Sequence, residues 1–319
     1  MLLYYSPQFL EHKTGSHPER PARLVEIMKH LEAKELDKKC ERPFWGPVSA
    51  ERLQRVHCSE YVQQVAKFAH DGGGHIEADT TVSTKSYDVA LLATGAACDA
   101  TQRVLKGESK TALCLVRPPG HHALQGGAMG FCLFNSVAVA ARAALAEFQL
   151  RRVLVIDWDV HHGNGTQDAF WDDGQVGFLS IHRFPFYPGS GAADETGAGK
   201  GLGMTLNLPI KFGTSRDDYL AAFRTRLEKF ADHVRPELIL LSAGFDAHRQ
   251  DPVGSLGLEV EDFTTLTKIV RQVADTHCGG KLVSILEGGY NVEVLPLCVA
   301  AHLEEMIRDE KQARGEVGE

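Results

Sequence analysis

Residues 153–165 read VLVIDWDVHHGNG, an apolar run followed at once by acids, histidines and glycines. The run itself, residues 153–156, is mostly β-branched and is typical of a buried strand in a parallel sheet. Asp157, Asp159 and His161 follow at every second position, so an extended backbone would point all three side chains to one side. Such a group predicts a site for a divalent cation. The alternative is a loop in which the acids cap a helix and the histidines are solvated.

Further apolar runs of strand length occur along the chain, and segments with helical spacing separate most of them. The strand-like runs are 2–5, 111–116, 153–156, 176–181, 204–208, 238–241 and 282–286. The helical segments are 18–31, 87–105, 135–148, 219–234, 260–274 and 294–307. This alternation predicts an α/β fold with one mostly parallel sheet and helices on both faces. We expect a single domain over residues 1–308 and a frayed tail over residues 309–319.

The composition suits a globular protein and excludes several classes of partner. The 319 residues are 43% hydrophobic and 24% charged, and a formal net charge of −8 argues against non-specific nucleic-acid binding. No apolar run approaches the ~20 residues that span a bilayer, and the first residues lack the features of a signal peptide. The seven cysteines show no paired CxxC spacing, which favours a reducing compartment over a disulfide framework. We therefore expect a cytoplasmic protein without direct nucleic-acid or membrane partners.

Polar residues follow almost every predicted strand. In sheets of this kind the ligand site lies beyond the carboxyl ends of the strands, so these residues are expected to converge. Besides residues 157–164, they include His121, His122, His182, Asp246, His248, Glu287 and Tyr290. Each has an ordinary structural explanation when taken alone, such as helix capping for an acid or core packing for a tyrosine. Their joint occurrence at strand ends predicts a functional site.

Asp159, His161 and Asp246 would give one metal ion three protein ligands. Three ligands leave room for water and substrate, as in catalytic rather than structural zinc sites. A metal ion held in this way lowers the pKa of bound water and polarises a carbonyl oxygen. This oxygen–nitrogen–oxygen ligand set suits Zn²⁺ and also tolerates Fe²⁺.

Hydrolysis at such a metal ion also needs a general base close to the water. His121 and His122 are two candidates, and a base histidine must be oriented by an acceptor on its far ring nitrogen. Asp157 and Asn164 are available as these acceptors. Tyr290 follows two glycines, which allow a tight turn that can bring its phenol close to the reacting carbonyl group.

Six motifs together resemble the zinc-dependent histone deacetylase family. They are HPERPAR at 17–23, RPPGHHA at 117–123, GFCLFNS at 130–136, DWDVHHGNG at 157–165, GFD at 244–246 and EGGY at 287–290. The motifs follow the family's order, and the resemblance covers nearly the whole chain. Asn164, where class I enzymes usually have Asp, and the sequence FNS at 134–136 indicate the class II branch or its bacterial relatives.

The resemblance implies an arginase–deacetylase fold with an eight-stranded parallel sheet, and zinc on Asp159, His161 and Asp246. A structural potassium ion is also implied, with Asp157 and Ser180 contributing oxygens. Arg23 would lie in the internal cavity behind the metal ion, where acetate leaves.

The resemblance also implies a role for each residue of the reaction centre. His122, supported by Asn164, would be the general base and then the acid that protonates the departing amine. His121, hydrogen-bonded to Asp157, would act mainly as an electrostatic partner of the metal-bound water and the transition state. Tyr290 would donate a hydrogen bond to the carbonyl oxygen and then to the oxyanion.

A substrate tunnel is implied as well, with Gly130, Phe131, Tyr187 and Val253 along its wall. The family usually has a second Phe where Tyr187 stands, which preserves stacking on an alkyl chain but changes the polarity of the tunnel. Polyamine-specific relatives carry an acidic residue at the mouth, where this chain places the apolar Val253.

We therefore favour a zinc amidohydrolase that removes acetyl or other acyl groups from the ε-amine of lysine in proteins or peptides. The first alternative keeps this chemistry and acts on acetylpolyamines or other small acylated amines. The second is a non-catalytic reader of acyl-lysine, and a binuclear arginase-type site ranks lower because it requires further acidic ligands.

Weaker signals are left without a functional role. Residues 197–203 lack the spacing of a phosphate-binding loop and are interpreted as a surface loop. By the resemblance, Glu77 and Asp79 lie where the family places rim residues that contact the substrate backbone, but we prefer to interpret them as capping residues of a helix or turn. His162 is unassigned. His248 is close to Asp246 and could act on the substrate side, but we interpret it as a solvated loop histidine.

Overall fold

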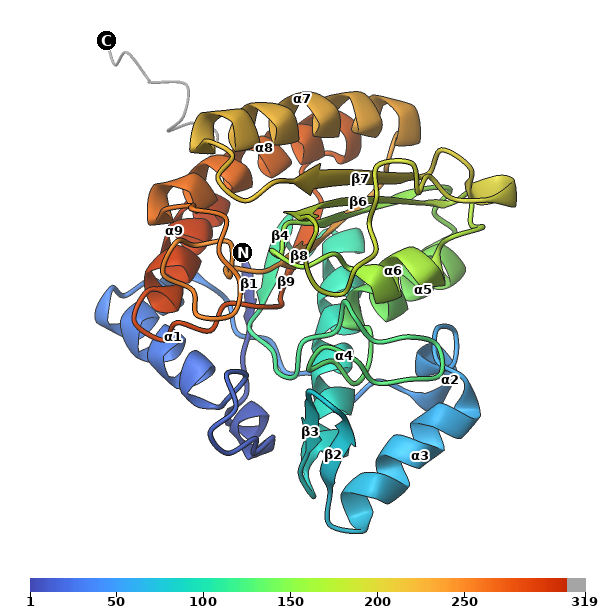
Figure 1. Ribbon diagram of the computed structural model, residues 1–319, viewed down its shortest axis with the longest axis vertical. Coiled ribbons are helices and arrows are strands. Elements are labelled where there is room, and N and C mark those ends of the chain that lie inside the picture. Colours follow the sequence, from blue (N-terminus) through green and yellow to red (C-terminus); the bar gives the residue numbers. More distant parts are fainter. Residues whose placement is uncertain (309–319) are drawn as a thin grey trace.

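The computed structural model describes residues 1–308 of the chain, which form one α/β domain around a seven-stranded parallel sheet (Figure 1). The expected tail at 309–319 lies outside the described residues. In order across the sheet the strands are β1 (Leu2–Tyr4), β4 (Thr111–Cys114), β9 (Leu282–Leu286), β8 (Ile239–Ala243), β5 (Val153–Asp157), β6 (Val176–Arg183) and β7 (Thr205–Ile210). Every pairing in this sheet is parallel, as the alternation of strands and helices predicts.

Each of the strand-like runs in the sequence forms a strand, but the expected count of eight is wrong for the described residues. The segment beside β1 makes only an isolated bridge between Leu2 and Glu41. Pro43 follows closely and has no N–H group with which to continue a ladder, so this edge stays a single bridge. The structure also contains a separate antiparallel hairpin, which consists of β2 (Gly74–Glu77) and β3 (Thr80–Val82). This hairpin was not predicted from the sequence, because β2 is largely exposed and carries no apolar run.

Helices cover both faces of the sheet. On one face, α4 (Ser86–Leu105) and α5 (Ser136–Phe148) pack on each other and on the central strands. On the other face lie α1 (Ala22–Ala33), α7 (Arg216–Val234), α8 (Val260–Cys278) and α9 (Leu295–Ile307) (Figure 1). The remaining helices are α2 (Ala50–Leu53), α3 (Ser59–His70) and α6 (Asn164–Ala169), and the 3₁₀ turns are η1 (Pro7–Glu11), η2 (Asp37–Lys39) and η3 (Gly199–Gly201). Among residues 1–308, no helix is long and apolar enough to cross a bilayer.

The core includes polar side chains that are fully enclosed. His302 of α9 is completely buried, and its two ring nitrogens lie 2.6 Å from Thr267 Oγ1 and 2.9 Å from Ser284 Oγ. Burial lowers the pKa of His302 to about 3, from an ordinary value of 6.5. The folded protein therefore keeps this imidazole neutral at a pH at which the unfolded chain takes up a proton.

We expect the free energy of unfolding to decrease as the pH falls below 6.5, because the unfolded chain then binds a proton that the folded chain binds only near pH 3. The slope is about 1.4 kcal/mol per pH unit for one histidine, or about 2 kcal/mol between pH 6.5 and pH 5. Urea unfolding of the wild type and His302→Gln at pH 7 and pH 5 tests this. The variant should lose less stability on acidification, and equal losses would contradict the assignment.

Candidate active site

The predicted site residues meet at the carboxyl edge of the sheet. Strands β4, β9, β8 and β5 are direct neighbours, so the segments that follow them lie next to one another. These four segments supply, among others, His121 and His122 after β4, Tyr290 after β9, Asp246 after β8, and Asp159 and His161 after β5. All six side chains are buried.

Asp159, His161 and Asp246 form a group that fits a metal ion. One ligand atom from each lies within 4.8 Å of the others, and His161 Nδ1 is 3.0 Å from Asp159 Oδ1 and 3.2 Å from Asp246 Oδ2. Burial and the charge of Asp159 raise the pKa of Asp246 to about 7, and Asp246 Oδ2 accepts no hydrogen bond. Two buried carboxylates beside an imidazole, one with an unsatisfied oxygen, are the donor set for a divalent cation.

Glycines give the neighbouring backbone access to these carboxylates. Gly288 N donates a hydrogen bond to Asp159 Oδ2 at 2.8 Å. A Cβ atom at Gly288 would lie only 2.1 Å from Asp246 Oδ2 and 2.5 Å from Asp159 Oδ2. The approach of this segment to the two acids therefore requires a residue without a side chain.

The alternation of residues 157, 159 and 161 predicts that all three side chains point to one cation site, but Asp157 does not belong to the metal-ligand group. Asp157 Oδ2 lies 2.9 Å from His121 Nδ1, and its Oδ1 accepts a hydrogen bond from the Asp159 amide at 3.0 Å. Asp157 is the last residue of β5, and the backbone turns after it, so the strict alternation ends there. Asp246 from β8 completes the group instead.

The two adjacent histidines have different partners. His122 Nδ1 lies 2.7 Å from Asn164 Oδ1, whereas His121 is paired with the carboxylate of Asp157. Burial lowers the pKa of His122 well below its usual value. Burial also opposes a charge on His121, but Asp157 and Asp159 outweigh it and raise the pKa of His121 to about 10. The pair thus combines a neutral imidazole with one in a strongly negative environment.

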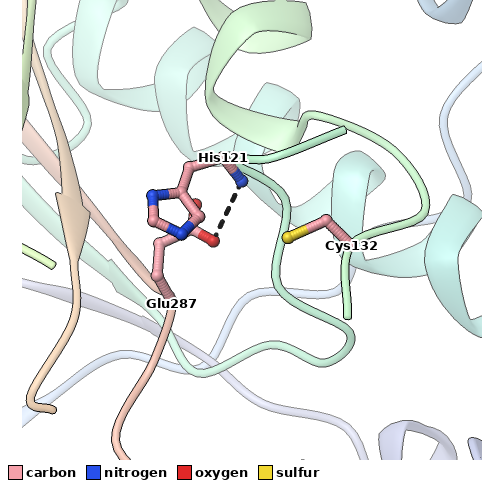
Figure 2. A group of neighbouring side chains, drawn as sticks. All are labelled: His121, Cys132 and Glu287. Atoms are coloured by element: carbon pink, nitrogen blue, oxygen red, sulfur yellow. Dashed lines mark hydrogen bonds between the residues drawn. The ribbon is translucent and has the colours of Figure 1, made fainter. Parts of the chain in front are cut away.

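Glu287 supports this pair, a role that the sequence analysis did not assign to it although it named Glu287 among the polar residues at strand ends. Figure 2 shows its carboxylate beside His121, whose amide donates to Glu287 Oε2 at 3.1 Å, and the Gly120 amide donates to the same oxygen at 2.6 Å. Its position directly after a buried strand was the available signal.

Cys132 lies close by, so His121, Cys132 and Glu287 form a second possible donor group. Burial raises the pKa of the Cys132 thiol well above its usual value, which disfavours a thiolate ligand, and Glu287 already accepts two backbone hydrogen bonds.

A narrow cavity of about 240 Å³ opens above the metal-ligand candidates. It is lined by Asp79, His122, Gly130, Phe131, His161, Phe186, Tyr187, Val253 and Tyr290. Gly130, Phe131, Tyr187 and Val253, the four residues named for the tunnel wall, thus line one cavity.

Two residues that line the cavity were not assigned to the tunnel wall from the sequence. Phe186 stacks on His161 at a ring-centroid distance of 5.3 Å. Asp79 was interpreted as a capping residue, but it lines the cavity and accepts the Gly130 amide at 3.1 Å. Burial and the nearby carboxylate of Asp79 raise the pKa of the Tyr187 hydroxyl. The mouth of the cavity therefore combines aromatic walls with one acid.

Arg23 lies behind Tyr290, with its guanidinium carbon 4.9 Å from the centre of the phenol ring. Arg23 Nε donates to Gly289 O at 2.6 Å and Nη2 to Glu287 O at 2.5 Å. The carboxylate of Glu19, 3.2 Å from Nη1, balances its charge. Arg23 is thus packed against the Tyr290 ring and bonded to the backbone of the segment that carries it.

The other predicted or unassigned residues lie outside the cavity lining. Ser180 is opposite Asp157 in the β5–β6 register, and its hydroxyl is 2.9 Å from His182 Nδ1.

The two ring nitrogens of His162 lie 2.8 Å from Ser190 Oγ and 3.0 Å from Gln167 Oε1. The interpretation of His248 as a solvated loop histidine is wrong, because its side chain is buried and accepts the Gln250 amide at 3.2 Å. Residues 197–203 form a turn that includes η3.

Comparison with known proteins identifies relatives of this fold and site. The family model described as "Histone deacetylase domain" matches residues 17–306. The histone deacetylase-like amidohydrolase of Pseudomonas aeruginosa is 38% identical, over 92% of this chain and 77% of its own. The human polyamine deacetylase HDAC10 is 39% identical, over 91% of this chain and 45% of its own. The crystal structure of the HDA15 HD domain superimposes with a TM-score of 0.91 and 36% identity, over 98% of this chain and 92% of that one, which confirms the arginase–deacetylase fold.

Replacement of Gly288 by alanine should weaken metal binding, because the added methyl group meets two candidate ligand carboxylates. We expect zinc affinity to fall by at least about 10-fold, the scale for disturbing the groups around a metal ligand. Titration of the apoprotein with zinc against a chromophoric chelator measures this. Gly46→Ala is the matched control, since a Cβ atom there meets nothing within 4 Å. Equal affinities for the two variants would contradict the assignment of the site.

Proposed function

Because the chain belongs to the histone deacetylase family and is a hydrolase that acts on amide bonds, we propose that it removes acetyl or related acyl groups from the ε-amine of lysine in proteins or peptides. The observation that carries this proposal is the cavity: aromatic walls lead to His122, His161 and Tyr290 at its inner end. Its form suits an uncharged side chain that enters end-on with its amide group foremost.

The walls of the cavity fit the aliphatic part of acyl-lysine. Phe131 packs edge-on against Tyr290 at 5.5 Å, and Tyr187 packs edge-on against His122 at 5.2 Å, both measured between ring centroids. Apolar ring faces favour methylene groups by burial, at roughly 0.8 kcal/mol for each CH₂ group. The walls therefore bind the chain of the substrate while the inner end meets its amide.

We propose that Asp159, His161 and Asp246 hold one Zn²⁺, or Fe²⁺ in its place. The bound ion supplies Lewis-acid chemistry, since it polarises the amide carbonyl and lowers the pKa of water. Asp157 and Ser180, which face each other in the sheet register, are proposed to contribute to a structural K⁺ site.

His122 is the proposed general base. Its Nδ1–H donates to Asn164 Oδ1, which leaves Nε2 unprotonated and able to take a proton from the attacking water. The same nitrogen then returns a proton to the departing amine. His121, paired with Asp157, provides positive charge beside the developing oxyanion.

Tyr290 is the proposed hydrogen-bond donor to the substrate's carbonyl oxygen. Burial raises the pKa of its phenol well above the usual value, so the hydroxyl keeps its proton at neutral pH. A donor held in a water-excluded site stabilises the oxyanion more strongly than it stabilises the neutral carbonyl.

A second candidate substrate class is small acylated amines such as acetylpolyamines. Asp79 at the cavity favours it, because a carboxylate there attracts the second amino group of a polyamine. Val253 opposes it, since an apolar side chain lies where polyamine-specific relatives have an acid. The third possibility, a non-catalytic reader, would require loss of a metal ligand or of Tyr290, and all four residues are present.

An acyl-substrate panel at measured zinc content should separate these functions. We expect kcat/KM for an acetyl-lysine peptide to exceed that for N-acetylspermidine by at least about 10-fold, a difference of about 1.4 kcal/mol in transition-state binding. A higher kcat/KM for N-acetylspermidine would contradict the peptide assignment and indicate a small acylated amine as the substrate. Binding of the peptide without turnover by zinc-loaded protein would favour the reader.

Tyr290→Phe should lower kcat by on the order of 10²-fold, the loss that follows removal of one oxyanion donor. Its zinc content should match that of the wild type, because the phenol is not part of the metal-ligand group. Steady-state kinetics with metal analysis of the same samples provides the measurement. Near-normal turnover would remove Tyr290 from the mechanism.

A further inference from the structure

Asp251 lies in the connection between β8 and α8 and holds two parts of the site with one carboxylate. The residue is buried, with 8% of its surface exposed. Its Oδ1 accepts the amides of Val253 at 2.9 Å and Gly254 at 3.0 Å. Its Oδ2 accepts the amide of Tyr290 at 2.7 Å and that of Asn291 at 3.3 Å. One side chain thus connects the tunnel wall to the segment that carries the phenol.

The peptide group before Tyr290 is held at both of its polar atoms. Arg23 Nε donates to Gly289 O at 2.6 Å, and Asp251 Oδ2 accepts from the Tyr290 amide at 2.7 Å. Because a peptide group is planar, fixing both atoms fixes the orientation of the plane from which the Tyr290 side chain starts. The two preceding glycines would otherwise leave this segment considerable freedom, and Gly289 has a φ of +117°.

The other pair of hydrogen bonds fixes the wall opposite. Val253 lines the cavity, and Gly254 packs so closely that a Cβ atom there would lie 2.4 Å from Asp246 O. The segment from Asp251 to Gly254 is therefore pressed against the backbone of a candidate metal ligand. Among the described residues no ion pair involves Asp251, so backbone amides balance its charge.

We propose that Asp251 is a positioning residue for the reaction, which sets the place of the Tyr290 phenol relative to the tunnel wall at Val253. The inference rests on the proposed function, since it acts through the phenol. Neither substrate nor metal ion contacts Asp251 in this scheme. Its contribution is to give the substrate-binding wall and the oxyanion donor a common anchor.

The substitution Asp251→Asn tests the inference, because an amide NH₂ group then faces two backbone N–H donors and one pair of hydrogen bonds is lost. We expect kcat on an acetyl-lysine peptide to fall by at least about 10-fold, as displaced catalytic groups lose rate steeply. In a Tyr290→Phe background the same substitution should lower kcat by less than about 2-fold. Equal losses in both backgrounds would overturn the proposal.

Asp262→Asn is the matched control. Asp262 is similarly buried, at 4% exposure, and accepts the Glu259 amide at 2.8 Å where α8 begins, outside the cavity lining. The control should lower the melting temperature and leave kcat within about 2-fold of the wild type. If it lowered kcat as much as Asp251→Asn does, the effect would be one of general stability, and the proposal would be wrong.

Amide hydrogen exchange gives a readout that does not depend on activity. In Asp251→Asn, the amides of the pair that loses its acceptor, Tyr290 with Asn291 or Val253 with Gly254, should exchange faster than in the wild type or in Asp262→Asn. Unchanged exchange at both Tyr290 and Val253 would overturn the positioning role whatever the kinetics show. If the zinc-loaded wild type turned over none of the acylated amines, the proposed function would be contradicted. The exchange measurement would still show whether Asp251 holds the Tyr290 and Val253 segments.

Discussion

Four buried carboxylates crowd the carboxyl edge of the central sheet, and keeping them together is the constraint on which the surrounding structure depends. Asp157, Asp159, Asp246 and Glu287 each have 0% exposure. Carboxylates in such an environment lose hydration and repel one another, which favours the protonated form unless positive charge or hydrogen-bond donors compensate. The neighbouring histidines, glycines and backbone amides are arranged to provide that compensation.

The compensation differs from one acid to the next, and this difference separates their functions. Asp157 is balanced by His121, and Glu287 by backbone amides of the 120–121 segment. Asp246 receives the Val160 amide on one oxygen and has no hydrogen-bond donor for the other. Asp157 thus orients the His121 imidazole and Glu287 the backbone that carries it, whereas the unsatisfied oxygen of Asp246 lies in the group that fits a cation.

Much of the fold could be predicted from the sequence because buried parallel strands are marked locally by apolar runs. The chemistry of strand-end residues offered Asp157 and Asn164 as acceptors for the two histidines, and the family resemblance assigned which histidine each one holds. Asp246 replaced Asp157 in the metal-ligand group because β8 lies beside β5, a long-range pairing that alternation within one segment does not contain. Asp79 was assigned to capping rather than to the cavity for a similar reason, since it reaches the cavity from an exposed hairpin whose position depends on tertiary contacts.

That hairpin has an evolutionary consequence. Asp79 in its connecting turn accepts the Gly130 amide on Oδ1, and Thr80 at the start of β3 accepts the Phe131 amide on Oγ1. Phe131 has a φ of +71°, a conformation that residues other than glycine rarely adopt. One wall of the cavity is thereby shaped by an appendage that belongs to no part of the central sheet. Substitutions in the hairpin can therefore change the shape of the cavity wall while the candidate metal ligands and the imidazole pair stay unchanged. The wall and the reactive groups are thus free to vary separately.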